Sequence, residues 1–200
     1  MGKTNLLMVQ HNHIESERII LRPVSLDDAE DMYEYTSDEE TTRYLYDKHK
    51  DLDQTKNFIA NYFLEEPIGK YALVLKEDNK MIGAIEFRVH ESNKCGELGY
   101  TLNRNFWGKG YMTEAGKSIL ELAFNVLDLE RVFAECDVIN AASGKVLDRL
   151  GMKCEGIHRK SHMTKGTLLD SAYYSILKEE YVTPKKRMKR LLTLNPNFTN

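Results

Sequence analysis

The sequence predicts an α+β fold, in which a mostly antiparallel central sheet carries helices on both faces. Two observations indicate this class. Segments with apolar residues three or four positions apart alternate with short β-branched runs, and three such runs in the middle of the chain are separated only by turn-forming residues. Strands joined by short turns pair antiparallel, and the helices that flank them must bury their apolar stripes against the sheet. With 200 residues, of which 42% are hydrophobic and 30% charged, the chain has the size and composition of one globular domain.

The first half of the chain supplies one strand and two helices. Residues 18–22 form a β-branched run that ends at Pro23, so they predict a first strand. Ser25 is a good N-cap with acids in the turn that follows it, which favours a helix over residues 26–36. A second apolar stripe at helical spacing predicts a helix over residues 53–63.

After position 70 the apolar pattern changes to the period of strands. Strands are expected at 71–75, 81–89 and 97–102, with turn chemistry at Asp78 and Asn79. The remaining expected elements are a long amphipathic helix that ends near residue 127, a strand at 131–137, a helix at 141–150, and closing strands at 152–158 and 168–178.

Composition excludes several classes of protein. No apolar run approaches 18 residues, so we expect no membrane span. The chain begins without an apolar signal core, and its three cysteines are far apart, so we expect reduced thiols at Cys95, Cys136 and Cys154 in a cytoplasmic protein. Cys154, His158 and His162 recur every four residues, but on an expected strand and without a fourth ligand, so no metal site is predicted.

The two ends differ from the middle of the chain. Residues 1–14 are interpreted as a polar leader, and residues 183–200 as a basic tail that holds five Lys or Arg side chains and no acid. The tail is either a solvated, partly helical end or an arm that touches nucleic acid or a ribosome, and we favour the first. Because the rest of the chain lacks a basic face, we expect no direct recognition of nucleic acid.

The most informative segment is the glycine-rich loop at residues 105–110, which lies between an expected strand and the long helix. Such a loop exposes backbone N–H groups at the positive end of a helix dipole, where a pyrophosphate binds. A dinucleotide fingerprint is excluded, because Thr113 stands where the third glycine is required. The alternative is a tight turn without a ligand.

A second motif follows: Asn140 is an N-cap for the next helix, and Gly151 ends that helix. Together the two motifs resemble the GNAT superfamily of N-acetyltransferases, with its acetyl-coenzyme A loop, Gln/Arg-x-x-Gly-x-Gly/Ala, and its following Asn…Gly motif. Residues 97–100 and 106–115 are most similar to the branch that acetylates the N-termini of ribosomal proteins (RimJ/RimL-like). The resemblance covers about residues 15–182, which implies a single GNAT-like domain.

The resemblance implies an enzyme that uses acetyl-CoA and no metal. It implies that Glu97 is the base that deprotonates the amine and that Ser143 serves the departing sulfur. Many members carry a tyrosine for the sulfur where this chain has Leu147, and Asn105 replaces the usual Gln or Arg of the loop. The residues that the resemblance assigns to acetyl-CoA are Tyr100, Leu102, Asn105, Gly108, Lys109, Gly110, Met112, Thr113 and Asn140.

The acceptor is left open by the sequence. Residues 27–53 hold eleven acids and three bases, which would attract a cationic amine. The resemblance favours a protein N-terminus such as that of a ribosomal protein, with a polyamine or an aminoglycoside as alternatives. A non-catalytic sensor that binds coenzyme A is a further alternative, and a homodimer is left open.

Overall fold

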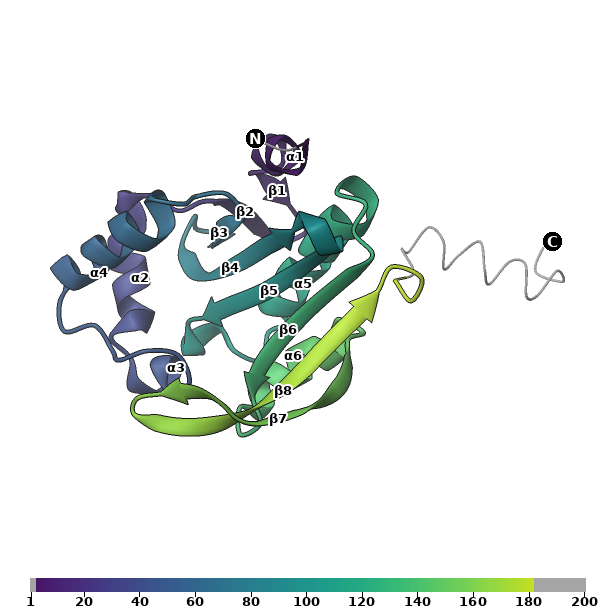
Figure 1. The fold of residues 1–200 in the computed structure, drawn as a ribbon. Helices are drawn as coiled ribbons and strands as arrows, with labels where there is room; N and C mark the ends of the chain where they lie inside the picture. Colours follow the sequence, from purple (N-terminus) through teal and green to yellow (C-terminus); the bar gives the residue numbers. More distant parts are fainter. Residues whose placement is uncertain (1–2, 182–200) are drawn as a thin grey trace, which may run out of the picture.

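The computed structural model describes residues 3–181, and its centre is one eight-stranded sheet in the order β1-β2-β3-β4-β5-β6-β8-β7 (Figure 1). Every neighbouring pair is antiparallel except β5 and β6, which are parallel. This confirms the predicted α+β class. The strands are β1 (Ile14–Glu15), β2 (Ile19–Pro23), β3 (Lys70–Leu75), β4 (Met81–His90), β5 (Cys95–Leu102), β6 (Arg131–Asp137), β7 (Lys153–Thr164) and β8 (Thr167–Leu177).

Helices cover both faces of this sheet, because its central strands are apolar on both sides. In β3, Leu73 and Leu75 belong to one buried cluster and Ala72 and Val74 to another. The first cluster includes α5 and α6, and the second includes α2 and η2. The helices are α1 (Lys3–Gln10), η1 (Leu26–Asp28), α2 (Ala29–Thr36), α3 (Glu39–Thr42), α4 (Leu52–Phe58), η2 (Ile59–Leu64), η3 (Glu91–Asn93), η4 (Arg104–Phe106), α5 (Tyr111–Glu121), η5 (Leu122–Val126) and α6 (Ala141–Arg149).

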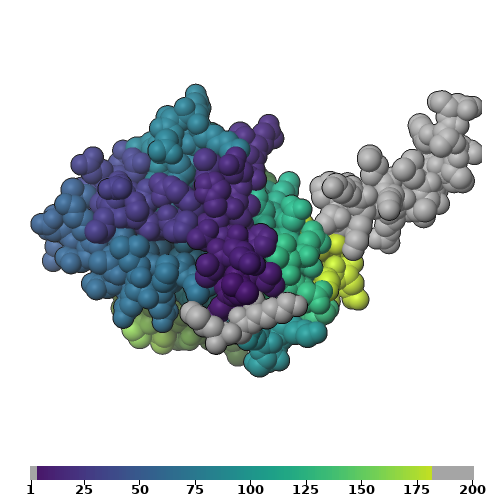
Figure 2. Space-filling model, turned by 90° about the horizontal axis from the view of Figure 1, so that it is seen from above, coloured from purple at the N-terminus to yellow at the C-terminus, as the bar shows by residue number. Residues whose placement is uncertain are grey.

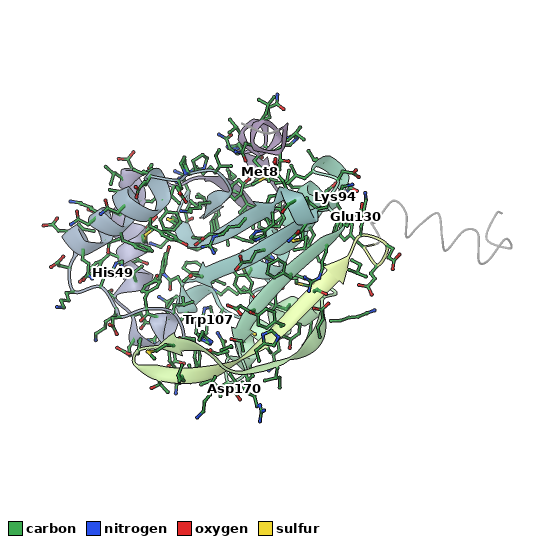
Figure 3. All side chains as sticks on the ribbon, in the orientation of Figure 1. Met8, His49, Lys94, Trp107, Glu130 and Asp170 are labelled. Carbon is green, nitrogen blue, oxygen red and sulfur yellow. The ribbon has the colours of Figure 1, made fainter. Side chains whose placement is uncertain are left out.

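Helix α1 lies within the segment interpreted as a polar leader. Its Met8 is only 2% exposed and belongs to the cluster that holds α5. The Tyr71 hydroxyl donates to the carbonyl of His11 (3.3 Å), which ties the end of this segment to β3. Seen from above, the purple N-terminal segment lies in the middle of the visible surface (Figure 2). Met8 points from α1 toward the sheet (Figure 3). The basic tail lies outside the described residues.

The sheet opens between β5 and β6, and this opening positions the functional site. The two strands pair only from Cys95 to Glu97, opposite residues 131–133. Beyond Glu97, β5 stays paired with β4, whereas β6 continues along β8. The second half of β5 therefore has one edge without a strand partner, facing the end of β6.

Candidate active site

A cavity of about 620 Å³ occupies this opening. Its walls come from β5, the glycine loop, the first turn of α5, the end of β6, α6 and the β7–β8 hairpin. It collects most of the residues assigned by the resemblance: Tyr100, Leu102, Gly108, Gly110, Met112, Thr113, Asn140 and Ser143. Asn105, Lys109 and Glu97 are not in its lining.

The glycine loop has the geometry that binding of a pyrophosphate requires. Gly108 (φ 75°) and Gly110 (φ 83°) both adopt the left-handed conformation that glycine tolerates best. The backbone N–H of Trp107 donates to the carbonyl of Arg104 (3.1 Å) and that of Glu114 to the carbonyl of Gly110 (3.0 Å), and among residues 3–181 the N–H groups between them have no acceptor. The Thr113 hydroxyl is buried, and it has no hydrogen-bond partner among the described residues. Unsatisfied donors at a helix N-terminus fit the phosphates of coenzyme A.

Arg18 and Glu114 brace this loop, and sequence reasoning missed both. Arg18 donates from Nη1 to the carbonyl of Lys109 (3.0 Å), from Nε to Glu114 Oε2 (2.7 Å) and from its backbone N–H to Glu114 Oε1 (2.8 Å). Burial raises the pKa of Glu114, but the hydrogen bonds from Arg18 and Ser16 outweigh it and hold that pKa below its ordinary value. The sequence shows that Glu114 is an acid in the first turn of the long helix. Its partner Arg18 is 96 positions away, so the pair could not be predicted from a local pattern.

Ser143 is held by two motif residues. Asn140 caps α6, as the sequence predicted, by accepting a hydrogen bond from the Ser143 backbone N–H (3.2 Å). The Tyr100 hydroxyl donates to the Ser143 carbonyl (3.1 Å) and lies 2.9 Å from Ser143 Oγ. Burial raises the pKa of Tyr100, so its hydroxyl keeps its proton. Because Tyr100 has one hydroxyl hydrogen and the Ser143 carbonyl takes it, the Ser143 hydroxyl donates to the Tyr100 oxygen, and it reaches another acceptor by turning about its C–O bond.

Leu102 presents a backbone donor to the opening. Asn103 donates its N–H to the carbonyl of Ile82 on β4 (2.8 Å). Successive backbone groups of a strand point to opposite sides, so the N–H of Leu102 points away from β4, toward the opening. The carbonyl of Leu102 accepts a hydrogen bond from Trp107 Nε1 (2.7 Å), and Trp107 lies beside the end of β5 (Figure 3).

Glu97 lies in a second, smaller cavity of about 320 Å³ on the other face of β5. Its carboxylate is 3.9 Å from Arg88 Nη1 and 3.7 Å from His90 Nε2. The two cavities share residues of the loop before α4 and of β5, among them Leu45 and Gly99. A Cβ at Gly99 would meet nothing within 4 Å, so there is free space beside β5 at this residue. The structure thus brings Ser143 and the loop together and places Glu97 across the strand from them.

Within residues 3–181, no group of three His, Cys, Asp or Glu side chains could hold a metal ion, and no helix is long and apolar enough to cross a membrane. His158 instead stacks on Tyr173, with ring centroids 3.9 Å apart. Cys95 is buried, Cys154 is exposed, and Cys136 lines the larger cavity; all three are free thiols.

Comparison with known proteins identifies the family and the fold. The family described as an acetyltransferase (GNAT) domain matches residues 18–153. The uncharacterized N-acetyltransferase p20 of Bacillus licheniformis is 34% identical over 171 residues, which cover 83% of this chain and 96% of that protein. The ribosomal-protein-serine acetyltransferase of Escherichia coli is 28% identical over 62% of this chain and 69% of its own length.

Among solved structures, the GNAT-family acetyltransferase from Bacillus anthracis superposes with a TM-score of 0.76 and 29% identity, covering 84% of this chain and 99% of that one. The chain therefore belongs to the GNAT acetyltransferase family. It is an N-acetyltransferase that uses acetyl-CoA as its cosubstrate, as the sequence motifs predicted.

Proposed function

We propose that this enzyme acetylates the N-terminal α-amine of a protein such as a ribosomal protein, as a cytoplasmic member of the RimJ/RimL-like branch. The observation that carries this proposal is the set of carboxylates that line the two adjoining cavities: Glu86 and Glu97 in the smaller one, and Glu40, Glu135 and Asp137 in the larger one. A cationic amine is favoured there over a neutral or anionic acceptor. The similarity to a ribosomal-protein-serine acetyltransferase supports a protein as the acceptor.

The chemistry assigns a role to each group of the site. The acceptor must lose a proton to free its lone pair, the tetrahedral oxyanion needs a donor, and the departing thiolate needs a hydrogen bond or a proton. The Leu102 N–H is the proposed donor to the oxyanion, and the Ser143 hydroxyl is the proposed donor to sulfur. The resemblance proposes Glu97 as the base. Gly108, Gly110 and the other residues named for acetyl-CoA are proposed to hold it.

A small amine is the second candidate acceptor, and the smaller cavity favours it. Six aromatic residues line that cavity together with Glu86, Arg88 and Glu97: Tyr35, Tyr46, Phe58, Tyr62, Phe63 and Tyr100. Aromatic faces and carboxylates both attract an ammonium group, so a polyamine or an aminoglycoside is the alternative.

Acetyl transfer from labelled acetyl-CoA to a panel of acceptors tests the proposal. We expect N-terminal peptides to be acetylated on the α-amine, and the same peptides with a blocked N-terminus but an internal lysine to be inert. Faster turnover of polyamines or aminoglycosides would replace the protein acceptor by the small amine. Tight binding of acetyl-CoA without transfer to any amine would favour the sensor.

A further inference from the structure

A chain of four polar side chains runs from the larger cavity to the surface, and no role has been assigned to it above. Asp137 at the end of β6 and His162 and Ser171 of the β7–β8 hairpin all line the cavity. His162 Nε2 is 2.6 Å from Asp137 Oδ1, and His162 Nδ1 is 2.8 Å from Ser171 Oγ. The exposed Ser161 donates to Ser171 Oγ (2.9 Å).

The hydrogen bonds of Ser161 and Ser171 favour one tautomer of the neutral His162 ring. Because Ser161 donates to Ser171, the hydroxyl hydrogen of Ser171 is available for His162 Nδ1. A neutral imidazole that accepts at Nδ1 carries its hydrogen on Nε2, the atom that lies 2.6 Å from Asp137 Oδ1. His162 therefore orients the carboxylate, in the same way that a second group orients a catalytic base elsewhere.

Asp137 is unusual for a buried carboxylate. Its side chain is only 1% exposed, and among residues 3–181 no donor other than His162 reaches either of its oxygens. Buried carboxylates ordinarily have several hydrogen-bond donors, because removing a charge from water is costly. Burial raises the pKa of Asp137, although His162 opposes that effect. A carboxylate with a free oxygen and a raised pKa is suited to accept a proton.

We propose that Asp137, oriented by His162, accepts the proton that the acceptor amine must lose before acetyl transfer. This inference rests on the proposed function and names a different base from Glu97. Asp137 shares the larger cavity with Ser143 and the Leu102 backbone, whereas Glu97 lies across β5 beside Arg88.

The proton balance of the step is complete without a further reactant. The N–H bond of the ammonium group breaks, the proton goes to the free Oδ2 of Asp137, and the electron pair stays on nitrogen. That pair forms the C–N bond at the thioester carbonyl, and collapse of the intermediate breaks the C–S bond. Of the two protons that the nitrogen loses overall, one ends on the coenzyme A thiol and the other is released to solvent.

Other charges around the cavity will influence the pH at which Asp137 titrates. Charged or titratable groups from α3, the segment after it, β6 and α6 share its lining: Glu40, Tyr44, Glu135, Lys145 and Arg149. Glu135 raises the pKa of Asp137 through charge repulsion. The pH profile of each variant must therefore be compared with that of the wild type under the same conditions.

The test measures acetylation of an N-terminal peptide by wild type, Asp137→Asn and Glu97→Gln across pH. We expect Asp137→Asn to lose roughly 10²–10⁴ in kcat/KM at neutral pH, the usual contribution of a positioned base. The loss should shrink at high pH, where more of the amine is already neutral. Methoxyamine is a neutral nucleophile at pH 7, so with it the variant should keep nearly wild-type turnover.

A separate comparison of kcat values tests whether His162 positions Asp137. His162→Gln retains an N–H donor for Asp137 and His162→Ala does not, so the glutamine variant should retain more kcat than the alanine variant. Asp170→Asn is the matched control, because Asp170 is an exposed acid on the same hairpin (Figure 3) and does not line the cavity. Its acetyl-CoA-dependent thermal shift and turnover should equal those of the wild type.

The outcomes separate this inference from the proposed function. If the wild type acetylates no amine, the proposed function and the base both fail. If the wild type is active and Asp137→Asn matches it at every pH, or if the pH-dependent loss falls on Glu97→Gln instead, only the assignment of Asp137 is overturned. If Asp137→Asn loses the same factor in turnover with a protonated amine and with a neutral nucleophile, the assignment is also overturned, since that result indicates a structural defect.

Discussion

At the scale of single residues, the site depends on side chains whose roles come from their neighbours. Asn140 would be an ordinary helix cap anywhere, but its position places the Ser143 hydroxyl against Tyr100 and in the wall of the larger cavity. Leu147, at the position where the family resemblance implies a tyrosine, is fully buried and has no polar atom for sulfur. Ser143 is therefore the donor that motif and structure both favour.

Replacement of Ser143 by alanine tests this role. We expect Ser143→Ala to lower kcat by roughly 10²–10⁴ while the KM for acetyl-CoA changes little, because the interaction is made with the departing thiolate. Steady-state kinetics with a saturating acceptor separate the two parameters. Ser118→Ala, which removes a hydroxyl from α5 away from the cavity, is the matched control. A raised KM with an unchanged kcat would show that Ser143 contributes to binding and not to departure of the thiolate.

At the scale of elements, the glycine loop and the start of α5 form one unit with β2. The sequence predicts the loop from its glycines and its place before an amphipathic helix, both of which are local signals. It does not predict that Arg18 would hold the Lys109 carbonyl and the Glu114 carboxylate. That contact depends on β2 and α5 lying together in the folded chain, which no local pattern encodes.

The brace predicts a pH-dependent stability. The pKa of Glu114 is lowered from 4.5, so the carboxylate stabilises the folded state above its ordinary pKa and stops doing so as pH falls through its folded pKa. We expect Glu114→Gln to lower the free energy of unfolding by about 1–3 kcal/mol at pH 7. The difference from wild type should shrink below pH ~4, when both side chains are neutral.

Urea unfolding at several pH values measures this difference, and an acetyl-CoA thermal shift measures the loop in parallel. Glu121→Gln, at an exposed position of the same helix, controls for loss of a charge alone. A difference between wild type and Glu114→Gln that stays constant from pH 7 to acid would contradict the linkage to Glu114.

Several elements differ from the sequence prediction, and β7 and α3 show the physical reasons. The predicted strand over 152–158 extends to Thr164 in β7, which is an edge strand exposed along nearly its whole length. Such a strand has no buried face, so the period-two pattern that marks strands is missing. Helix α3 has only four residues, too few for an apolar stripe to recur.

At the scale of the whole molecule, the N-terminal segment belongs to the core. Met8 contacts the cluster that also contains β3 and α5, and a Cβ at Gly69 would lie 3.1 Å from Met8 Cε. Met8 lies in the apolar run from Leu6 to Val9, in which Leu6 and Val9 are exposed, so the sequence gives no periodic signal that marks Met8 as the buried residue. Helix α1 thus packs against the central sheet, although the strands in the middle of that sheet are far from it in the sequence.

Truncation of this methionine tests the contribution of α1 to stability. We expect Met8→Ala to destabilise the fold by about 2–5 kcal/mol, the usual cost of removing a buried Met side chain. Leu6→Ala, at a position 60% exposed on the same helix, should change stability by less than about 0.5 kcal/mol. Equal, small effects of both substitutions on the melting temperature would show that α1 does not stabilise the sheet.

The sequence by itself determined the α+β class, the order of nearly all strands and helices, the glycine loop and the cap of α6, because each of these depends on residues close together in the chain. Only the tertiary structure decided that β5 and β6 part after Glu97 and that Glu97 and Ser143 face different cavities. It also brought Asp137 of β6 against His162 of β7. The physical reason is that side-chain proximity across strands and helices depends on register and packing between distant segments, which local propensity and periodicity do not specify.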